Sequence, residues 1–320
     1  EDTNYQPVEP TGTLLHAYVN TGSGYAWVAI GTENGAMQLL KEETTEYIGG
    51  GASNGMIYMA AKGSSKINQI DPADDYAVSA GNFDRRSTTM VDLSSGISKT
   101  VTINGKEYEV GVPVYISRDS SGNQYAFAMF DHTSYTDDIY SQMLVFDAQA
   151  VAVAYVSANT TSSYYKERFV VLFSNGQLYD LDVTYPGNGT SKADVALGSW
   201  IGSGLPAVSS ASMVCADGNE LIIAANTEDG VQLYSYDMTS RTVSELAAVE
   251  GAQSLVGLSL LKDVRPELVP CEHTNLGAWE YDENGHWKTC ECGEKFEQGE
   301  LTLEEVVEYA YTHEPVQKSG

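Results

Sequence analysis

Cysteine and histidine side chains are concentrated near the C-terminal end of the chain. Three of its four cysteines and two of its five histidines lie in this segment, where the candidate metal ligands are Cys271, His273, His286, Cys290 and Cys292. Structural zinc takes four such ligands in a tetrahedron, and the spacings C-x-H, H-x3-C and C-x-C place them on two short arms. This pattern favours a structural zinc site, although C-x-C departs from the usual C-x2-C knuckle.

A disulfide is the alternative chemistry for the same cysteines. Exported proteins favour disulfides, and Cys271 can pair with Cys290 or with Cys292. Three cysteines cannot all pair among themselves, and a bond between Cys290 and Cys292 would be strained, so the odd number favours metal. The fourth cysteine, Cys215, lies on a predicted strand, where we expect it to be a small buried apolar residue.

A second group of chemically capable side chains occurs in the segment DHTSYTDDIY. It holds the catalytic candidates Asp131, His132, Asp137 and Asp138, on a long predicted loop of the kind that carries binding sites on a rigid scaffold. Paired carboxylates there would suit a glycosidase or lyase. A solvated polar loop is the interpretation that the composition favours. His16, in the predicted strand LLHAYV, is expected to be a hydrogen-bonded packing residue rather than a base.

Aromatic residues in turn-like segments indicate a different function. A ring there can stack on the face of a sugar while neighbouring Asn or Asp side chains bond its hydroxyls, and the candidates are Tyr135, Tyr140, Tyr164, Tyr165 and Trp200. Glycan binding is therefore chemically feasible. The alternative for each ring is a structural role, because tyrosine is common in β-sheets.

Two further motifs are expected to form turns rather than active sites. The segment from Gly51 to Gly55 matches G-x-S-x-G, but a nucleophile elbow needs a strand-to-helix turn, and here we predict a Gly-rich turn between strands. SRDSSGNQY, around Asp119, is similar to a sialidase aspartate box with one residue too many. Such boxes form turns in propeller blades.

The charge excludes several classes of partner. Seventeen basic and 44 acidic residues give a formal net charge of -27. A chain of this charge repels phosphate backbones and anionic lipid surfaces, so we expect no nucleic acid or membrane partner. The acidity favours solubility, and calcium binding by acidic loops is the lesser alternative. There is no apolar run of eighteen residues, and we expect no membrane insertion.

Short apolar runs between residues 13 and 262 predict an all-β domain. Five hairpins recur, each with an apolar strand followed by a turn and an alternating strand that often ends in aspartate. The apolar members are AWVAI, MIYMAA, YAFAMF, FVVLF and LIIAA, and the alternating members are GAMQLL, SKINQID, QMLVFD, GQLYDLD and VQLYSYD. The terminal aspartates, Asp71, Asp147, Asp182 and Asp237, are expected to accept hydrogen bonds from turn amides.

Repetition of one hairpin at intervals is what radial repeats of four-stranded sheets leave in a sequence. RFVVLFSNGQLYDLD and MIYMAAKGSSKINQID resemble blades of the WD40-like and quinoprotein-like β-propeller families. We predict a β-propeller of six blades, with five or seven as alternatives and a two-sheet sandwich as the rival fold. Segment 76–111 is expected to add a blade, and SLVGLSLL to close the ring against LLHAYV.

The composition changes after the predicted propeller. We expect a flexible N-terminus over 1–12, a propeller over 13–262, a linker over 263–270 and a small Cys/His module over 271–320. Thr302 and Glu305 match a capping box before a short C-terminal helix, with a strand as the alternative. A module of this size cannot bury enough apolar surface to be stable, so it needs a disulfide or a bound metal.

The module resembles a short Cys/His/Trp repeat found in surface proteins of gut Firmicutes. The matching positions are His273, Trp279, His286, Trp287, Cys290, Cys292 and Gly293. The resemblance implies export from a Gram-positive bacterium. The polar start of the chain, which lacks methionine, suits an N-terminus left after removal of an export signal.

These patterns together predict a secreted or cell-surface binding protein. Its propeller loops would recognise a glycan or a protein partner, and the C-terminal module would be stabilised by zinc or a disulfide. The alternatives are a carbohydrate-active propeller enzyme that uses loop carboxylates and a structural spacer.

Overall fold

A computed structural model describes residues 8–64, 66–84, 89–128, 140–189, 193–271, 276–282, 285–290 and 293–299. Several predicted features lie outside these ranges: Asp131, His132, Tyr135, Asp137, Asp138, His273, Cys292 and the C-terminal helix. The chain divides into two compact units, residues 1–268 and 269–320. In the described part of the chain, no helix is long and apolar enough to cross a membrane.

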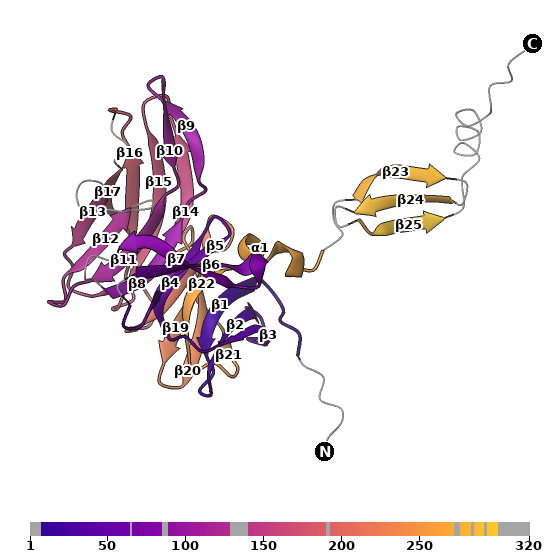
Figure 1. The fold of residues 1–320 in the computed structure, drawn as a ribbon, viewed down its shortest axis with the longest axis horizontal. Helices are drawn as coiled ribbons and strands as arrows, with labels where there is room; N and C mark the ends of the chain where they lie inside the picture. Colours follow the sequence, from indigo (N-terminus) through magenta and orange to yellow (C-terminus); the bar gives the residue numbers. More distant parts are fainter. Residues whose placement is uncertain are drawn as a thin grey trace, which may run out of the picture. The chain divides into compact units, whose positions relative to one another are not determined.

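The described part of unit 1 contains five four-stranded antiparallel sheets (Figure 1). The first has the order β22-β1-β2-β3 and consists of Ser254–Leu260 (β22), Leu14–Asn20 (β1), Tyr25–Gly31 (β2) and Met37–Glu43 (β3). The second consists of Tyr47–Ser53 (β4), Met56–Ala61 (β5), Lys66–Asp71 (β6) and Ala77–Asp84 (β7). The third consists of Thr89–Ser95 (β8), Pro113–Arg118 (β11), Gln124–Ala128 (β12) and Tyr140–Leu144 (β13).

The last two sheets follow the same sequential pattern. The fourth consists of Ala150–Thr160 (β14), Tyr165–Phe173 (β15), Leu178–Tyr185 (β16) and Asp194–Gly202 (β17). The fifth consists of Ala211–Cys215 (β18), Glu220–Thr227 (β19), Gly230–Asp237 (β20) and Thr242–Val249 (β21). A separate hairpin joins Lys99–Ile103 (β9) to Lys106–Val110 (β10). Short helical segments are Pro72–Asp74 (η1), Leu261–Val264 (α1) and Pro266–Leu268 (η2).

All five predicted hairpins are confirmed by strand pairing. They are β2–β3, β5–β6, β12–β13, β15–β16 and β19–β20. The predicted pairing of SLVGLSLL with LLHAYV is also confirmed, because β22 from the end of unit 1 pairs with β1 from its beginning. A strand from the far end of the chain thus completes the first sheet.

The expectation of a sixth sheet from segment 76–111 is wrong for the described residues. Its strands complete other sheets: β7 is the fourth strand of the second sheet, and β8 begins the third. The hairpin β9–β10 instead packs against the fourth sheet, where the Asn104 amide donates to the Ser162 carbonyl at 2.9 Å. Ile103 and Tyr108 of this hairpin share a hydrophobic core with Tyr165 and Tyr185.

One edge strand of each four-stranded sheet contacts edge strands of two other sheets. These strands, β4, β8, β14, β18 and β22, are called the inner strands below. β4 contacts β8, β8 contacts β14, β14 contacts β18, β18 contacts β22, and β22 contacts β4. The contacts therefore run in a cycle that returns to its starting strand.

Polar side chains hold neighbouring sheets together. Asp92 and Ser94 of β8 accept hydrogen bonds from the backbone amides of Val153 and Tyr155 of β14, both at 2.9 Å. Between the fifth and first sheets, the Asn226 side chain accepts from the Leu255 amide at 2.8 Å and donates to its carbonyl at 3.0 Å. These bonds satisfy backbone groups that a sheet edge would otherwise leave unpaired.

The Gly-rich segment is an inner strand, which corrects the predicted turn. Gly49 and Gly51 lie on β4, and only Asn54 and Gly55, with positive φ, form the turn to β5. A methyl group at position 51 would lie 2.0 Å from the Leu93 carbonyl oxygen of β8. The close approach of two inner strands therefore requires glycine there.

The predicted turn role is confirmed for Asp71 and Asp237, two of the four aspartates that end the alternating strands. Asp71 accepts from the Ala73 amide at 3.0 Å, and Asp237 accepts from the Thr239 and Ser240 amides. Asp119 accepts from the amides of Ser121 and Asn123, so the box-like segment does form a turn. Asp182 instead forms an ion pair with Lys166 at 2.7 Å.

Unit 2 contains a three-stranded antiparallel sheet. Its strands are Leu276–Asp282 (β23), Gly285–Cys290 (β24) and Lys295–Gly299 (β25), with β24 in the centre. Among its described residues, Cys290 alone is a buried hydrophobic side chain, and Trp279 is 46% exposed. This sheet therefore gains little from an apolar core.

Candidate binding site

The inner strands surround a cavity of about 570 Å³, called the inner-strand cavity. Every inner strand contributes to its wall: Ala52 of β4, Leu93 to Ser95 of β8, Tyr155 and Val156 of β14, Met213 to Cys215 of β18, and Leu258 to Leu260 of β22. Except in β14, these residues lie towards the C-terminal end of their strand. In four of the five sheets, the C-terminal end of the inner strand therefore faces the cavity.

Connections that follow the inner strands complete the wall with polar groups. Asn54 comes from the β4–β5 turn, Asp217 from the β18–β19 turn, and Lys262 and Asp263 from α1. Ser259 is 6% exposed, and its hydroxyl oxygen has no hydrogen-bond partner among the described residues. A buried hydroxyl without a partner is unfavourable, and a ligand in the cavity can relieve that cost.

The cavity combines an aromatic ring with titratable groups. Partial desolvation raises the pKa of the Asp263 carboxyl, and the neighbouring Lys262 opposes this shift only in part. Burial also raises the pKa of the Cys215 thiol, so this thiol is kept in its neutral, unreactive form. Burial raises the pKa of the Tyr155 hydroxyl, with a further contribution from the carboxylate of Glu167.

Glu167 lies directly behind the cavity wall. A methyl group at position 96 would come within 2.9 Å of both its Oε1 atom and the Tyr155 ring, so only glycine leaves room for the carboxyl group. The side chain is fully buried, without a well-formed hydrogen bond among the described residues. Burial raises its pKa to about 7, although Tyr165, the Gly111 amide and Lys99 favour its ionised form.

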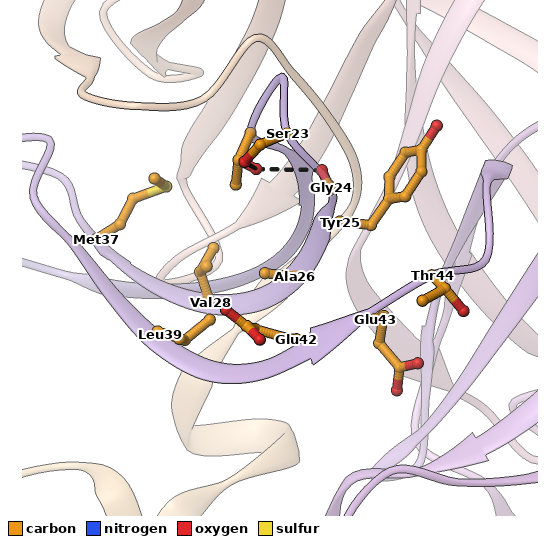
Figure 2. A pocket seen from close by; sticks show the side chains of 11 residues that line it. Ser23, Gly24, Tyr25, Ala26, Val28, Met37, Leu39, Glu42, Glu43 and Thr44 are labelled. Carbon is orange, nitrogen blue, oxygen red and sulfur yellow. Dashed lines mark hydrogen bonds between the residues drawn. The ribbon is translucent and has the colours of Figure 1, made fainter.

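A second hollow, the β2–β3 groove, lies on the first sheet (Figure 2). Its volume is about 990 Å³, and its wall combines the apolar Met37 and Leu39 with the carboxylates of Glu42 and Glu43. In the β1–β2 turn beside it, the Thr21 hydroxyl donates to the Gly24 carbonyl at 3.2 Å. The groove is larger than the inner-strand cavity, but the residues that line it come from one sheet and its turns. We therefore regard the inner-strand cavity as the better candidate site.

The aromatic residues predicted to bind a sugar do not converge on one site. Tyr165 is 1% exposed and belongs to the core, so it cannot contact a ligand. Trp200 is exposed on β17 next to Tyr179, whereas Tyr164 adjoins Tyr165, which pairs with Tyr185. Tyr179 and Tyr185 are six positions apart on β16, about 20 Å along the strand, so Trp200 and Tyr164 are far from each other. Tyr140 lies on β13.

The environments of Trp200 and His16 are explained by local packing. The Trp200 indole donates to the Gln177 side chain at 2.7 Å, and the Arg241 guanidinium lies 5.1 Å from its ring. The His16 ring packs beside the rings of Trp27 and Tyr76, with centroids 5.3 Å and 5.8 Å away, and its Nε2 atom lies 2.8 Å from the Tyr76 hydroxyl. Burial lowers its pKa to about 3, so it is neutral at physiological pH. The predicted packing role of His16 is confirmed.

Of the predicted metal ligands, the structure brings two together in unit 2. The sulfur atoms of Cys271 and Cys290 lie 3.3 Å apart. His286 and Cys290 are four residues apart on β24, about 13 Å along the strand, so they cannot bind one ion. Among the described residues, no group of three or more His, Cys, Asp and Glu side chains is arranged to hold a metal.

The residues of the inner-strand cavity were not predicted from the sequence. Tyr155, Ser259 and Asp263 occur in three segments for which the sequence indicated no binding or catalytic role. Their position in the chain could have indicated the site, because each residue lies on, or just after, the inner strand of a sheet.

Comparison with known proteins identifies no family for this chain. No protein-family model matches it, and no curated protein matches it. Among solved structures, it is similar to a functionally unknown protein from Desulfotomaculum acetoxidans DSM 771, with a TM-score of 0.31 and 9% identity. That match covers 90% of this chain and 95% of the other.

Proposed function

We propose that unit 1 is a five-bladed β-propeller and that its inner-strand cavity binds an uncharged glycan. Each four-stranded sheet would be one blade. The cyclic contacts of the inner strands and the pairing of β22 with β1 support this arrangement. In a protein of this composition, we further propose that binding occurs outside the cell or at its surface.

One observation carries the binding proposal: a single cavity is lined by all five inner strands. Its volume of about 570 Å³ lies within the range of ligand pockets, roughly 300–1,000 Å³. It offers the unpartnered Ser259 hydroxyl, the Asn54 side chain and the carboxylate of Asp263 to sugar hydroxyls, and the Tyr155 ring to a sugar face. The net charge of -27 disfavours anionic ligands.

A glycan array, followed by calorimetry on each ligand found, tests the proposal with the full chain. The informative variant is Ser259→Ala, because removing a hydroxyl that has no protein partner should leave the fold intact. We expect it to weaken binding roughly 5–10-fold, which corresponds to one lost hydrogen bond. Tyr155→Ala should weaken binding further, because it removes the stacking surface.

Ser23→Ala, in the β2–β3 groove, is the matched control and should bind as the unaltered chain does. If binding were lost in Ser23→Ala and kept in Ser259→Ala, the site would be the groove. Mixtures of the chain with each glycan are also assayed for new reducing ends, whose appearance would indicate a glycosidase instead of a binding protein. If no glycan were retained, the proposal would fail.

A further inference from the structure

Cys271 and Cys290 form a close pair at the start of the unit 2 sheet. Their sulfur atoms lie 3.3 Å apart, and Cys290 ends β24, opposite Leu276 at the beginning of β23. Cys290 is buried, whereas Cys271 is partly accessible. The Gly293 amide donates a hydrogen bond to the Cys290 carbonyl at 2.8 Å.

The described residues of the surrounding sheet bury little apolar surface. Most described residues of β23 are exposed, and the interior residues of β24 are half-buried. A small sheet without an apolar core needs a covalent or metal staple. The two described cysteines suffice for a disulfide, whereas a structural zinc site needs two more ligands, and among the described residues the remaining candidate, His286, is too far along the strand to be one.

We propose that Cys271 and Cys290 form a disulfide that closes the β23–β24 hairpin. The inference is independent of the proposed binding function, because it concerns unit 2 alone. The bond encloses both strands and reduces the conformational freedom of the unfolded segment.

The reaction balances with an external disulfide such as oxidised glutathione. The thiolate of Cys271, the more accessible of the two, attacks a sulfur of the oxidant and displaces one glutathione thiolate. The thiolate of Cys290 then attacks the Cys271 sulfur of the mixed disulfide and displaces the second. Two protein thiols lose two protons and two electrons, and the oxidant is reduced to two thiols.

Peptide mapping of the full chain tests the pairing. The oxidised protein is alkylated without reduction and cut with trypsin, which places Cys271 in peptide 263–288 and both Cys290 and Cys292 in peptide 289–295. We expect these two peptides to be linked, and fragmentation of the linked pair to assign the bond to Cys290. Thiol titration should fall from four per chain in the reduced protein to two.

Three variants separate this proposal from its rivals. Cys292→Ser and Cys215→Ser should each keep the link, whereas Cys290→Ser should lose it or transfer it to Cys292. Cleavage after Lys288 by trypsin under native conditions should be about tenfold slower in the oxidised chain than in the reduced chain, since the bond disfavours opening of the hairpin.

Three results would overturn the proposal. The first is four free thiols after incubation with oxidised glutathione. The second is a link from Cys271 to Cys215 or to Cys292 in the unaltered chain. The third is about one zinc per chain, with thiols that become reactive only after chelation. None of these outcomes would alter glycan binding by unit 1, so the two proposals can fail separately.

Discussion

At the scale of single residues, Glu167 is the most unusual group of unit 1. It occupies the space left by the missing side chain of Gly96, beside Tyr155 in the wall of the inner-strand cavity. Because burial disfavours the charged form, its pKa is raised from 4.5 to about 7. Above pH 7 the folded protein must therefore hold a buried negative charge.

This placement predicts how stability depends on pH. In the unfolded chain Glu167 loses its proton near pH 4.5, whereas in the folded protein it keeps the proton until about pH 7. The folded state thus binds more protons between these values, and its stability falls as pH rises through this window. The loss amounts to at most about 3 kcal/mol, from about 1.4 kcal/mol per pKa unit.

Glu167→Gln tests this expectation, because the amide has nearly the same shape and does not titrate. Denaturant unfolding at pH 4 and pH 8 measures the unfolding free energy of both chains. Between pH 4 and pH 8, the unfolding free energy of the variant should rise by roughly 3 kcal/mol relative to that of the unaltered chain. Glu250→Gln, at an exposed position, should not change the profile. Parallel profiles for Glu167→Gln would contradict the predicted pH dependence.

At the scale of elements, β4 is determined by its neighbour rather than by its own propensity. Glycine is unfavourable in strands, yet three consecutive glycines occur in β4. Gly49 and Gly51 face backbone carbonyls of β8, at distances that exclude a Cβ atom. The close packing of two inner strands outweighs the intrinsic preference of the residue.

Gly51→Ala should therefore destabilise unit 1 by about 1–3 kcal/mol, as overpacking does. The new methyl group would meet the Leu93 carbonyl oxygen at 2.0 Å, and the inner strands would have to separate. Gly24→Ala is the control, because no atom lies within 4 Å of the added group. Thermal unfolding measures both. A transition for Gly51→Ala that matched the control would show that β4 and β8 are not so closely packed.

At the scale of the whole molecule, the two units have separate stabilising contacts. Unit 1 includes α1, whose Leu261 and Val264 are buried, so the predicted linker begins inside a packed unit. The last inner strand, β22, pairs with β1 from the other end of unit 1. Unit 1 is therefore complete only when the chain reaches residue 268.

Two truncations test this organisation. A chain that ends after Leu268 should unfold cooperatively, with nearly the same midpoint as unit 1 in the full chain, because it retains every sheet of that unit. A chain that ends before β22 removes one strand from the first sheet and breaks the cycle of inner-strand contacts, so it should fail to fold. Circular dichroism during heating measures both. A folded shorter chain would contradict the role assigned to β22.

The sequence by itself determined the local elements of this protein. Alternating and apolar runs specify the five hairpins, because the side-chain pattern of a strand depends on its own residues. The pairing of SLVGLSLL with LLHAYV was also predicted correctly. The sheet count and the cavity were decided by tertiary structure. Only packing between sheets shows that β4 is an inner strand and that Tyr155, Ser259 and Asp263, far apart in the chain, share one cavity. Contacts between segments so far apart in the chain depend on how closely their backbones approach each other in the folded protein, and the residues of one short segment do not determine that distance.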